Sequence, residues 1–186
     1  TPTPEPIIPD NRFEDMNEAL WAVEAVQALQ SAGIISASKE FRPNDRVTRE
    51  EFAKMVVSMA GLQDSYETTG FTDVDPDAWY ASFVSTARRN GIVNGIDDHQ
   101  FGVGSNIIRQ DMAVMVYRAL RLTGFTGENG NLSFNDSDHI SAYAAEAVEY
   151  LSNNEIVNGS GGYFYPKSYC TRAEAAQIIY NILKRK

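Results

Sequence analysis

The chain has 186 residues, of which 43% are hydrophobic and 22% are charged, and its formal net charge at pH 7 is −9. This length can bury the core of one domain or of two small ones, whereas the negative charge disfavours nucleic acid and anionic lipid as partners. The sequence predicts no membrane insertion, because it lacks an apolar run of about 18 residues. Its single cysteine, Cys170, excludes an internal disulfide.

Residues 1–12 read as the end of a linker. The segment opens with TPTPEPIIPD, which contains four prolines, and this composition favours an extended, polyproline-like chain. A frayed terminus is the alternative interpretation. We expect the linker to join the chain to a larger upstream protein.

Three similar segments follow, over residues 13–62, 71–122 and 134–186. Each opens with Phe-x-Asp, at Phe13, Phe71 and Phe134, and continues with apolar residues spaced as on one face of a helix. These stripes are Ala22, Ala25, Val26, Leu29; Tyr80, Phe83, Val84, Ala87; and Ala144, Ala147, Val148, Leu151. Each segment is therefore predicted to begin with an amphipathic helix.

A turn ends each predicted first helix. Gly33 and Gly91 hold the position after the first two helices, where glycine accommodates a left-handed backbone. The third segment has Glu155 there, so we expect its helix to end differently. Gly95 and Gly159 follow in two segments, and each fits either a tight turn or the close approach of a bound sugar.

A second helix is predicted in every segment. A phenylalanine is followed by an arginine eight residues on, an acid ten residues on and an alanine twelve residues on. These sets are Phe41, Arg49, Glu51, Ala53; Phe101, Arg109, Asp111, Ala113; and Phe164, Arg172, Glu174, Ala176. The apolar stripes that follow are Phe52, Met55, Val56, Met59; Met112, Met115, Val116, Ala119; and Ala175, Ile178, Ile179, Ile182.

The repetition predicts an all-α fold made of three helix–loop–helix units. One such hairpin buries too little apolar surface to be stable alone. Three can supply each other with partners by packing around a shared axis. We therefore expect the three units to form one compact domain.

These motifs resemble the S-layer homology family from Phe13 to Lys184. The opening motif is complete in Phe71-Thr72-Asp73-Val74. The element that starts the second helix reads Thr48-Arg49-Glu50-Glu51, Ile108-Arg109-Gln110-Asp111 and Thr171-Arg172-Ala173-Glu174.

The resemblance implies a three-lobed domain with pseudo-threefold packing and grooves between its lobes, monomeric as an isolated module. It also implies a non-covalent anchor on the bacterial cell surface or wall, fused to a larger surface protein. Its implied partner is a secondary cell-wall polysaccharide that often carries pyruvylated N-acetylmannosamine. The implied ligand contacts are Arg49, Arg109 and Arg172, and a guanidinium group matches the carboxylate of a pyruvylated sugar. We expect alanine at Arg109 or Arg172 to weaken wall binding without unfolding the domain. A salt bridge to an acid of a neighbouring repeat is the alternative role.

The residues beside the arginines have structural interpretations as well. Thr48 with Glu51, and Thr171 with Glu174, form capping-box patterns, and we assign Asp111 the corresponding structural role. Ile108 breaks the box in the second repeat. Aromatic residues recur near the start of each first helix; we expect packing for Trp21 and leave packing or glycan contact open for Trp79.

No catalytic, metal or cofactor site is predicted. The series Asp73-x-Asp75-x-Asp77 has Ala78 where a calcium loop needs glycine. Cys170 stands where the other repeats have Val47 and Ile107, which indicates a core position. The alternative function is a protein–protein module for surface-layer assembly.

Overall fold

The computed structural model describes residues 13–63, 65–131 and 133–185. Over these ranges the chain forms six α-helices, two short 3-10 helices and no extended strand. The α-helices are α1 (Val23–Ser31), α2 (Arg49–Met59), α3 (Ala81–Arg89), α4 (Arg109–Leu122), α5 (Ala142–Asn153) and α6 (Arg172–Leu183). The 3-10 helices are η1 (Met16–Ala22) and η2 (Ser137–His139). The predicted all-α class is confirmed, while the expected linker at residues 1–12 lies outside the described residues.

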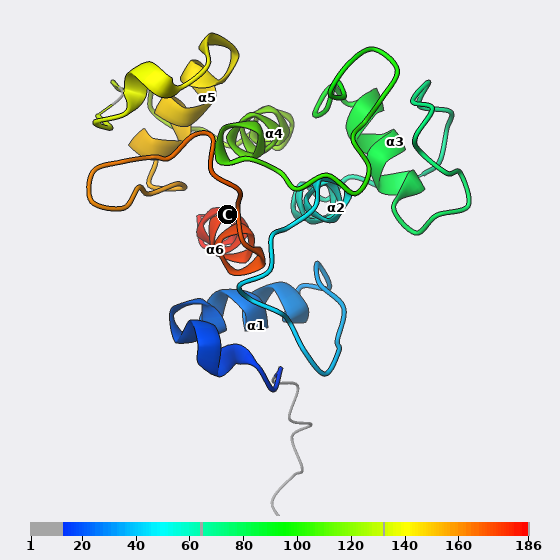
Figure 1. Ribbon diagram of the computed structural model, residues 1–186, viewed down its shortest axis with the longest axis horizontal. Coiled ribbons are helices and arrows are strands. Elements are labelled where there is room, and N and C mark those ends of the chain that lie inside the picture. Colours follow the sequence, from blue (N-terminus) through cyan, green and yellow to red (C-terminus); the bar gives the residue numbers. More distant parts are fainter. Residues whose placement is uncertain (1–12, 64, 132, 186) are drawn as a thin grey trace, which may run out of the picture.

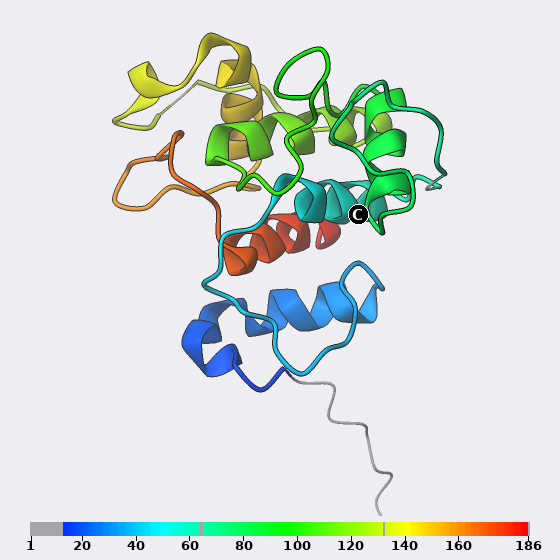
Figure 2. The same cartoon turned by 45° about the vertical axis from the view of Figure 1, so that its right-hand side comes forward.

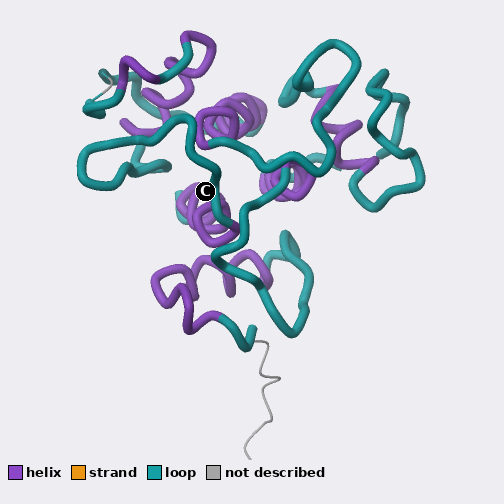
Figure 3. The backbone as a smooth tube through the Cα atoms, in the orientation of Figure 1, coloured by secondary structure: helices purple, strands orange, loops and turns teal. Residues whose placement is uncertain are grey.

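The second helix of every repeat lies at the centre of the molecule. Figure 1 shows α2, α4 and α6 nearly end-on, with α1, α3 and α5 around them, and α2 contacts both α4 and α6. Loops make up much of the outer part of each lobe (Figure 3). None of the helices in the described ranges is both long and apolar enough to cross a membrane.

Each lobe combines helices from two repeats. The first helix of a repeat packs on the second helix of the repeat before it, since α3 packs on α2 and α5 on α4. The pattern closes when α1, from the first repeat, packs on α6, from the last; Figure 2 shows these two helices one above the other. The α-helices of each repeat therefore pack mainly on α-helices of the other repeats.

Backbone hydrogen bonds link the three repeats in a cycle just before the central helices. The N–H of Val47 donates to the carbonyl of Cys170 at 3.0 Å, that of Cys170 to Ile107 at 3.1 Å, and that of Ile107 to Val47 at 3.1 Å. One residue of each repeat thus donates to one neighbour and accepts from the other. We call Val47, Ile107 and Cys170 the axial ring.

The predicted apolar stripes form one continuous core. All their residues are buried except Tyr80 and Phe83, which pack against the core while partly exposed. Cys170 is 0% exposed, which confirms its core position, and burial raises the pKa of its thiol. Because each stripe faces a helix of another repeat, the core is also the interface between repeats.

The aspartate of each Phe-x-Asp motif ties the start of a repeat to its second phenylalanine. Asp73 accepts N–H groups from Phe101, Gly102 and Val103 at 2.8 to 2.9 Å. The equivalent bonds run from Phe41 and Arg42 to Asp15, and from Phe164 and Tyr165 to Asp136. Burial opposes ionisation of Asp73 and Asp136, but these N–H donors outweigh it and lower the pKa of both carboxyls.

The expectation that the third repeat ends its first helix differently is wrong. Glu155 adopts φ of 54°, beside 70° at Gly33 and 69° at Gly91. Ile156 donates to Leu151 as Ile34 does to Leu29. Tertiary packing therefore imposes the left-handed turn on a residue that does not favour it.

Candidate functional site

Three clefts of the same design lie between the lobes. Their cavity volumes are about 280 Å³ for cleft A, 450 Å³ for cleft B and 500 Å³ for cleft C. Six positions that are equivalent between the repeats line every cleft. In cleft A they are Arg172, Ile34, Ser36, Glu51, Lys54 and Trp79. The same positions are Arg49, Ile92, Asn94, Asp111, Val114 and Tyr143 in cleft B, and Arg109, Ile156, Asn158, Glu174, Gln177 and Trp21 in cleft C.

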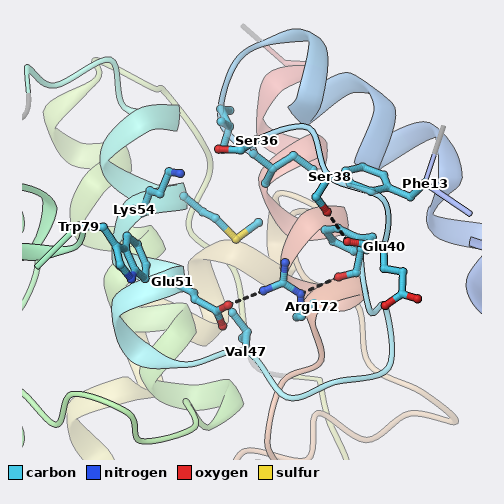
Figure 4. A pocket seen from close by; sticks show the side chains of 13 residues that line it. Phe13, Ser36, Ser38, Glu40, Val47, Glu51, Lys54, Trp79 and Arg172 are labelled. Carbon is cyan, nitrogen blue, oxygen red and sulfur yellow. Dashed lines mark hydrogen bonds and ion pairs between the residues drawn. The ribbon is translucent and has the colours of Figure 1, made fainter. Parts of the chain in front are cut away.

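Every cleft draws on all three repeats. In cleft A the arginine starts α6, the facing turn and α2 belong to the first repeat, and Trp79 precedes α3. Figure 4 shows Lys54 and Trp79 along one side of this cleft, Ser36, Ser38 and Glu40 along the other, and Arg172 between them. A cleft of this kind exists only when the three repeats have closed on each other.

The arginines of the clefts make the same two contacts each time. Nη1 reaches the acid of the next repeat, at 3.3 Å from Arg49 to Asp111, 3.0 Å from Arg109 to Glu174 and 2.5 Å from Arg172 to Glu51. Nε donates to the carbonyl of a phenylalanine, at 2.8 to 3.0 Å. These carbonyls belong to Phe101, Phe164 and Phe41.

The three arginines differ in how deeply their side chains are buried. The side chains of Arg49 and Arg109 are 9% and 10% exposed, whereas that of Arg172 is 20% exposed. Burial lowers the pKa of Arg49, and the charge of Asp111 opposes that shift. The arginines thus occupy the predicted grooves and also form the inter-repeat salt bridges named as their alternative role.

The remaining donors of the arginines also differ between clefts. Nη2 of Arg109 donates to the carbonyl of Asn158 at 3.4 Å. Nη2 of Arg49 and Nη2 of Arg172 hydrogen-bond to no residue within the described ranges. A guanidinium group has five N–H donors, so clefts A and B keep more of them for a ligand than cleft C does.

The predicted capping boxes are confirmed at α2 and α6. Thr48 accepts from the N–H of Glu51 while the Glu51 carboxylate accepts from the N–H of Thr48, and Thr171 and Glu174 repeat the pattern. The other carboxylate oxygen of Glu51 accepts a hydrogen bond from Nη1 of Arg172. One carboxylate therefore both caps its own helix and holds the arginine of a neighbouring repeat.

Asp111 has a structural role but forms no capping box, in agreement with the pattern that Ile108 breaks. Ile108 has no side-chain oxygen, and α4 begins without a side-chain cap. The carboxylate of Asp111 instead accepts from Arg49 at 3.3 Å and from the hydroxyl of Tyr143 at 2.5 Å. Burial and this carboxylate raise the pKa of Tyr143 to about 12.

An exposed aromatic residue stands at the rim of each cleft. Trp21, Trp79 and Tyr143 are 59%, 56% and 61% exposed. The expectation of packing for Trp21 is wrong, because the adjacent Ala22 takes the core position and leaves the indole beside cleft C. In cleft A, Nζ of Lys54 lies 5.9 Å from the ring centre of Trp79.

Gly95 and Gly159 are required by the fold. A Cβ at Gly95 would lie 2.5 Å from the carbonyl oxygen of Gln100, and one at Gly159 would lie 2.3 Å from that of Tyr163. Both glycines also line their clefts. The structure therefore supports the tight-turn interpretation, and their contact with a glycan stays a prediction.

Sequence reasoning missed the cleft residues further along the central helices. Lys54, Val114 and Gln177 lie three residues after the acids, and Arg118 and Asn181 lie seven after. Residues three and seven positions apart share a helix face. The positions of the acids in the sequence could therefore have predicted these additional cleft residues. Across the described ranges, no three His, Cys, Asp or Glu side chains gather where they could hold a metal ion.

The chain is similar to parts of much longer proteins. An amylopullulanase of Thermoanaerobacterium thermosulfurigenes is 34% identical over 95% of this chain and 10% of its own length. Exoglucanase XynX of Acetivibrio thermocellus is 33% identical over 93% of the chain and 16% of its own length. The surface-layer 125 kDa protein of Lysinibacillus sphaericus is 29% identical over 83% of the chain and 13% of its own length.

The domain family confirms the resemblance identified from the sequence. The S-layer homology domain matches residues 12–53, 70–113 and 133–176, one match in each repeat. This domain type, together with the similarity to surface-layer proteins, indicates a location at the cell surface or cell wall. With three matches that cover more than half of its residues, the chain belongs to the S-layer homology family.

Proposed function

We propose that this chain is a non-catalytic module that anchors a larger surface protein to the bacterial cell wall. It binds an anionic secondary cell-wall polysaccharide in clefts A, B and C. The observation that carries the proposal is the threefold recurrence of one cleft, with an arginine inside and an exposed aromatic residue at its rim.

The chemistry of the clefts suits an acidic sugar. The aromatic rim offers a flat apolar surface to a sugar ring, and the arginine offers charge-assisted hydrogen bonds to a carboxylate such as that of a pyruvylated sugar. Each arginine is the first residue of its helix, so the positive end of the helix dipole adds to its attraction for an anion. In a chain of net charge −9, such local sites are where an anion can bind.

One cleft is expected to bind weakly. A charge-assisted hydrogen bond contributes about 1.5–3 kcal/mol, and the neighbouring acid already takes part of each guanidinium group. Several clefts on one repeating polymer raise the overall affinity through effective concentration. The proposed anchor therefore depends on the polymer and not on one tight site.

Wall sacculi of the producing bacterium provide the test. Binding of the purified chain is measured before and after chemical removal of the polysaccharide, and again with Arg172→Gln, because Arg172 is the most exposed of the three arginines. We expect binding to vanish with the polysaccharide and to fall about tenfold with the variant, which corresponds to the loss of about 1.4 kcal/mol.

Lys39→Gln is the matched control, since Lys39 is exposed and pairs with Glu14 outside the clefts. Equal binding to intact and stripped sacculi would replace the polysaccharide with peptidoglycan as the partner. Oligomers that form without wall material and persist after the arginine substitutions would instead support a module for surface-layer assembly.

A further inference from the structure

We infer that cleft B is the main anion-binding cleft, and that it continues into a second subsite for the acidic group of the adjacent sugar. This inference rests on the proposed function and deepens it. The second subsite, called the side hollow, lies between α4, α5 and the turn after α3. It is lined by Asn90, Tyr117, Arg118, Arg121, Tyr143 and Glu146.

The side hollow adjoins cleft B. Arg118, Val114 and Tyr143 line both cavities, and the hollow adds a volume of about 410 Å³ to the 450 Å³ of the cleft. Arg49 lies in the cleft and Arg121 in the hollow, with Arg118 shared between them. The groove therefore offers cations along its length instead of at one point.

Neither arginine of the hollow forms an ion pair within the described ranges. Arg118 donates to the carbonyl of Ile92 at 3.3 Å, and Arg121 donates to the hydroxyl of Tyr117 at 3.3 Å. The one acid in the hollow, Glu146, accepts from the hydroxyl of Tyr117 at 2.6 Å. The positive charges of the hollow are thus less neutralised than those of the arginines paired with acids across the clefts.

Cleft B with its side hollow has the most positive lining of the three sites. Arg49, Arg118 and Arg121 face Asp111 and Glu146, which leaves a formal charge of +1. In cleft A, Lys54 and Arg172 balance Glu40 and Glu51, and in cleft C, Arg109 balances Glu174. An anionic chain is therefore attracted to cleft B first.

Comparison between repeats indicates that the charge of Arg118 exceeds what the fold needs. The equivalent Asn181 donates to the carbonyl of Ile156 at 3.1 Å, as Arg118 does to Ile92. A neutral side chain thus satisfies this carbonyl. The guanidinium group of Arg118 adds a charge and further donors to a residue that lines both cavities.

The groove defines its ligand by chemistry. Two consecutive sugars fit it when each carries a carboxylate or another anionic group, one near Arg49 and the other near Arg118 and Arg121. Tyr117 and Tyr143 line the hollow and can pack against a sugar ring. A polymer with an acidic group on every unit therefore gains more from this groove than one with isolated acidic groups.

The test uses the double variant Arg118→Asn with Arg121→Gln. Asparagine restores the contact that the third repeat already makes at this position, so the fold is expected to persist, as a thermal melt would verify. The control is Lys184→Gln with Arg185→Gln, which removes two charges at the corresponding end of α6. Both are measured against sacculi and against size-fractionated fragments of the polysaccharide stripped from them.

We expect the double variant to bind sacculi about tenfold more weakly, and the control to stay within about twofold of the unchanged chain. A fragment of two sugars should compete better than a single sugar for the unchanged chain, and the double variant should lose that gain. If the double variant binds like the control, the side hollow is not a subsite. If the unchanged chain binds stripped and intact sacculi equally, the proposed function itself fails.

Discussion

The centre of the molecule and the rims of its clefts use the three repeats in different ways. At the centre, Val47, Ile107 and Cys170 make one cycle of equivalent hydrogen bonds, and the three cleft arginines repeat one pair of contacts. Around the clefts, the exposed rim residues are Trp79, Tyr143 and Trp21, and equivalent positions on the cleft walls carry Lys54, Val114 and Gln177. The centre keeps what closing the fold requires, whereas the side chains that line the clefts differ from one cleft to the next.

The largest expected effect comes from breaking the centre. Arg109→Ala leaves the buried carbonyl of Phe164 and one of the two carboxylate oxygens of Glu174 without their donor, and removing one partner of a buried ion pair costs about 3 kcal/mol. Urea unfolding followed by circular dichroism should show this fall in the free energy of unfolding. Burial thus reverses the expectation from sequence that such a change would leave the fold intact.

Arg89→Ala is the matched control for that loss. Arg89 pairs with Glu67 at 2.8 Å on the surface, where the two side chains are 38% and 66% exposed. A surface ion pair contributes at most about 1 kcal/mol. If both variants lose the same small amount, the arginine contacts at the centre do not hold the repeats together.

A smaller effect on stability is expected at acidic pH, and it comes from the aspartates of the Phe-x-Asp motifs that open the repeats. The pKa of Asp136 is lower in the folded chain than in the unfolded chain, so its contribution to stability is complete above the ordinary aspartate pKa of about 3.9 and is lost as the pH falls below it. Asp136→Asn should lower the melting temperature at pH 7. It should also flatten the dependence of that temperature on pH below about 4.

The neighbouring Asp138 provides the comparison, because its side chain is 79% exposed. Asp138→Asn should leave both the melting temperature at neutral pH and its fall in acid nearly unchanged. Similar curves for the two variants would mean that the bonds from Phe164 and Tyr165 to Asp136 add no stability to the charged carboxylate.

The sequence predicts the centre better than the rims. Apolar spacing and the Phe, Arg and acid register repeat three times, so the helices and the core stripes follow from the pattern alone. The clefts that hold the arginines follow from the family resemblance that these motifs carry. Which repeat packs on which does not follow, because α1 reaches α6 across the whole chain. The side hollow could not be predicted from the sequence either, because Arg118 and Arg121 line a shared cavity only when α5 packs on α4.

The smallest expected effect concerns the turn at Glu155, where the third repeat departs from the other two. A non-glycine residue in the left-handed region costs about 1 kcal/mol, and the exposed pair of Glu155 with Arg185 returns only part of it. Glu155→Gly should therefore stabilise the chain by about 0.5 kcal/mol in urea unfolding. Gly33→Glu, in the equivalent turn of the first repeat, should do the opposite. If both changes destabilise, the ion pair of Glu155 contributes more to the third repeat than the relief of its backbone strain.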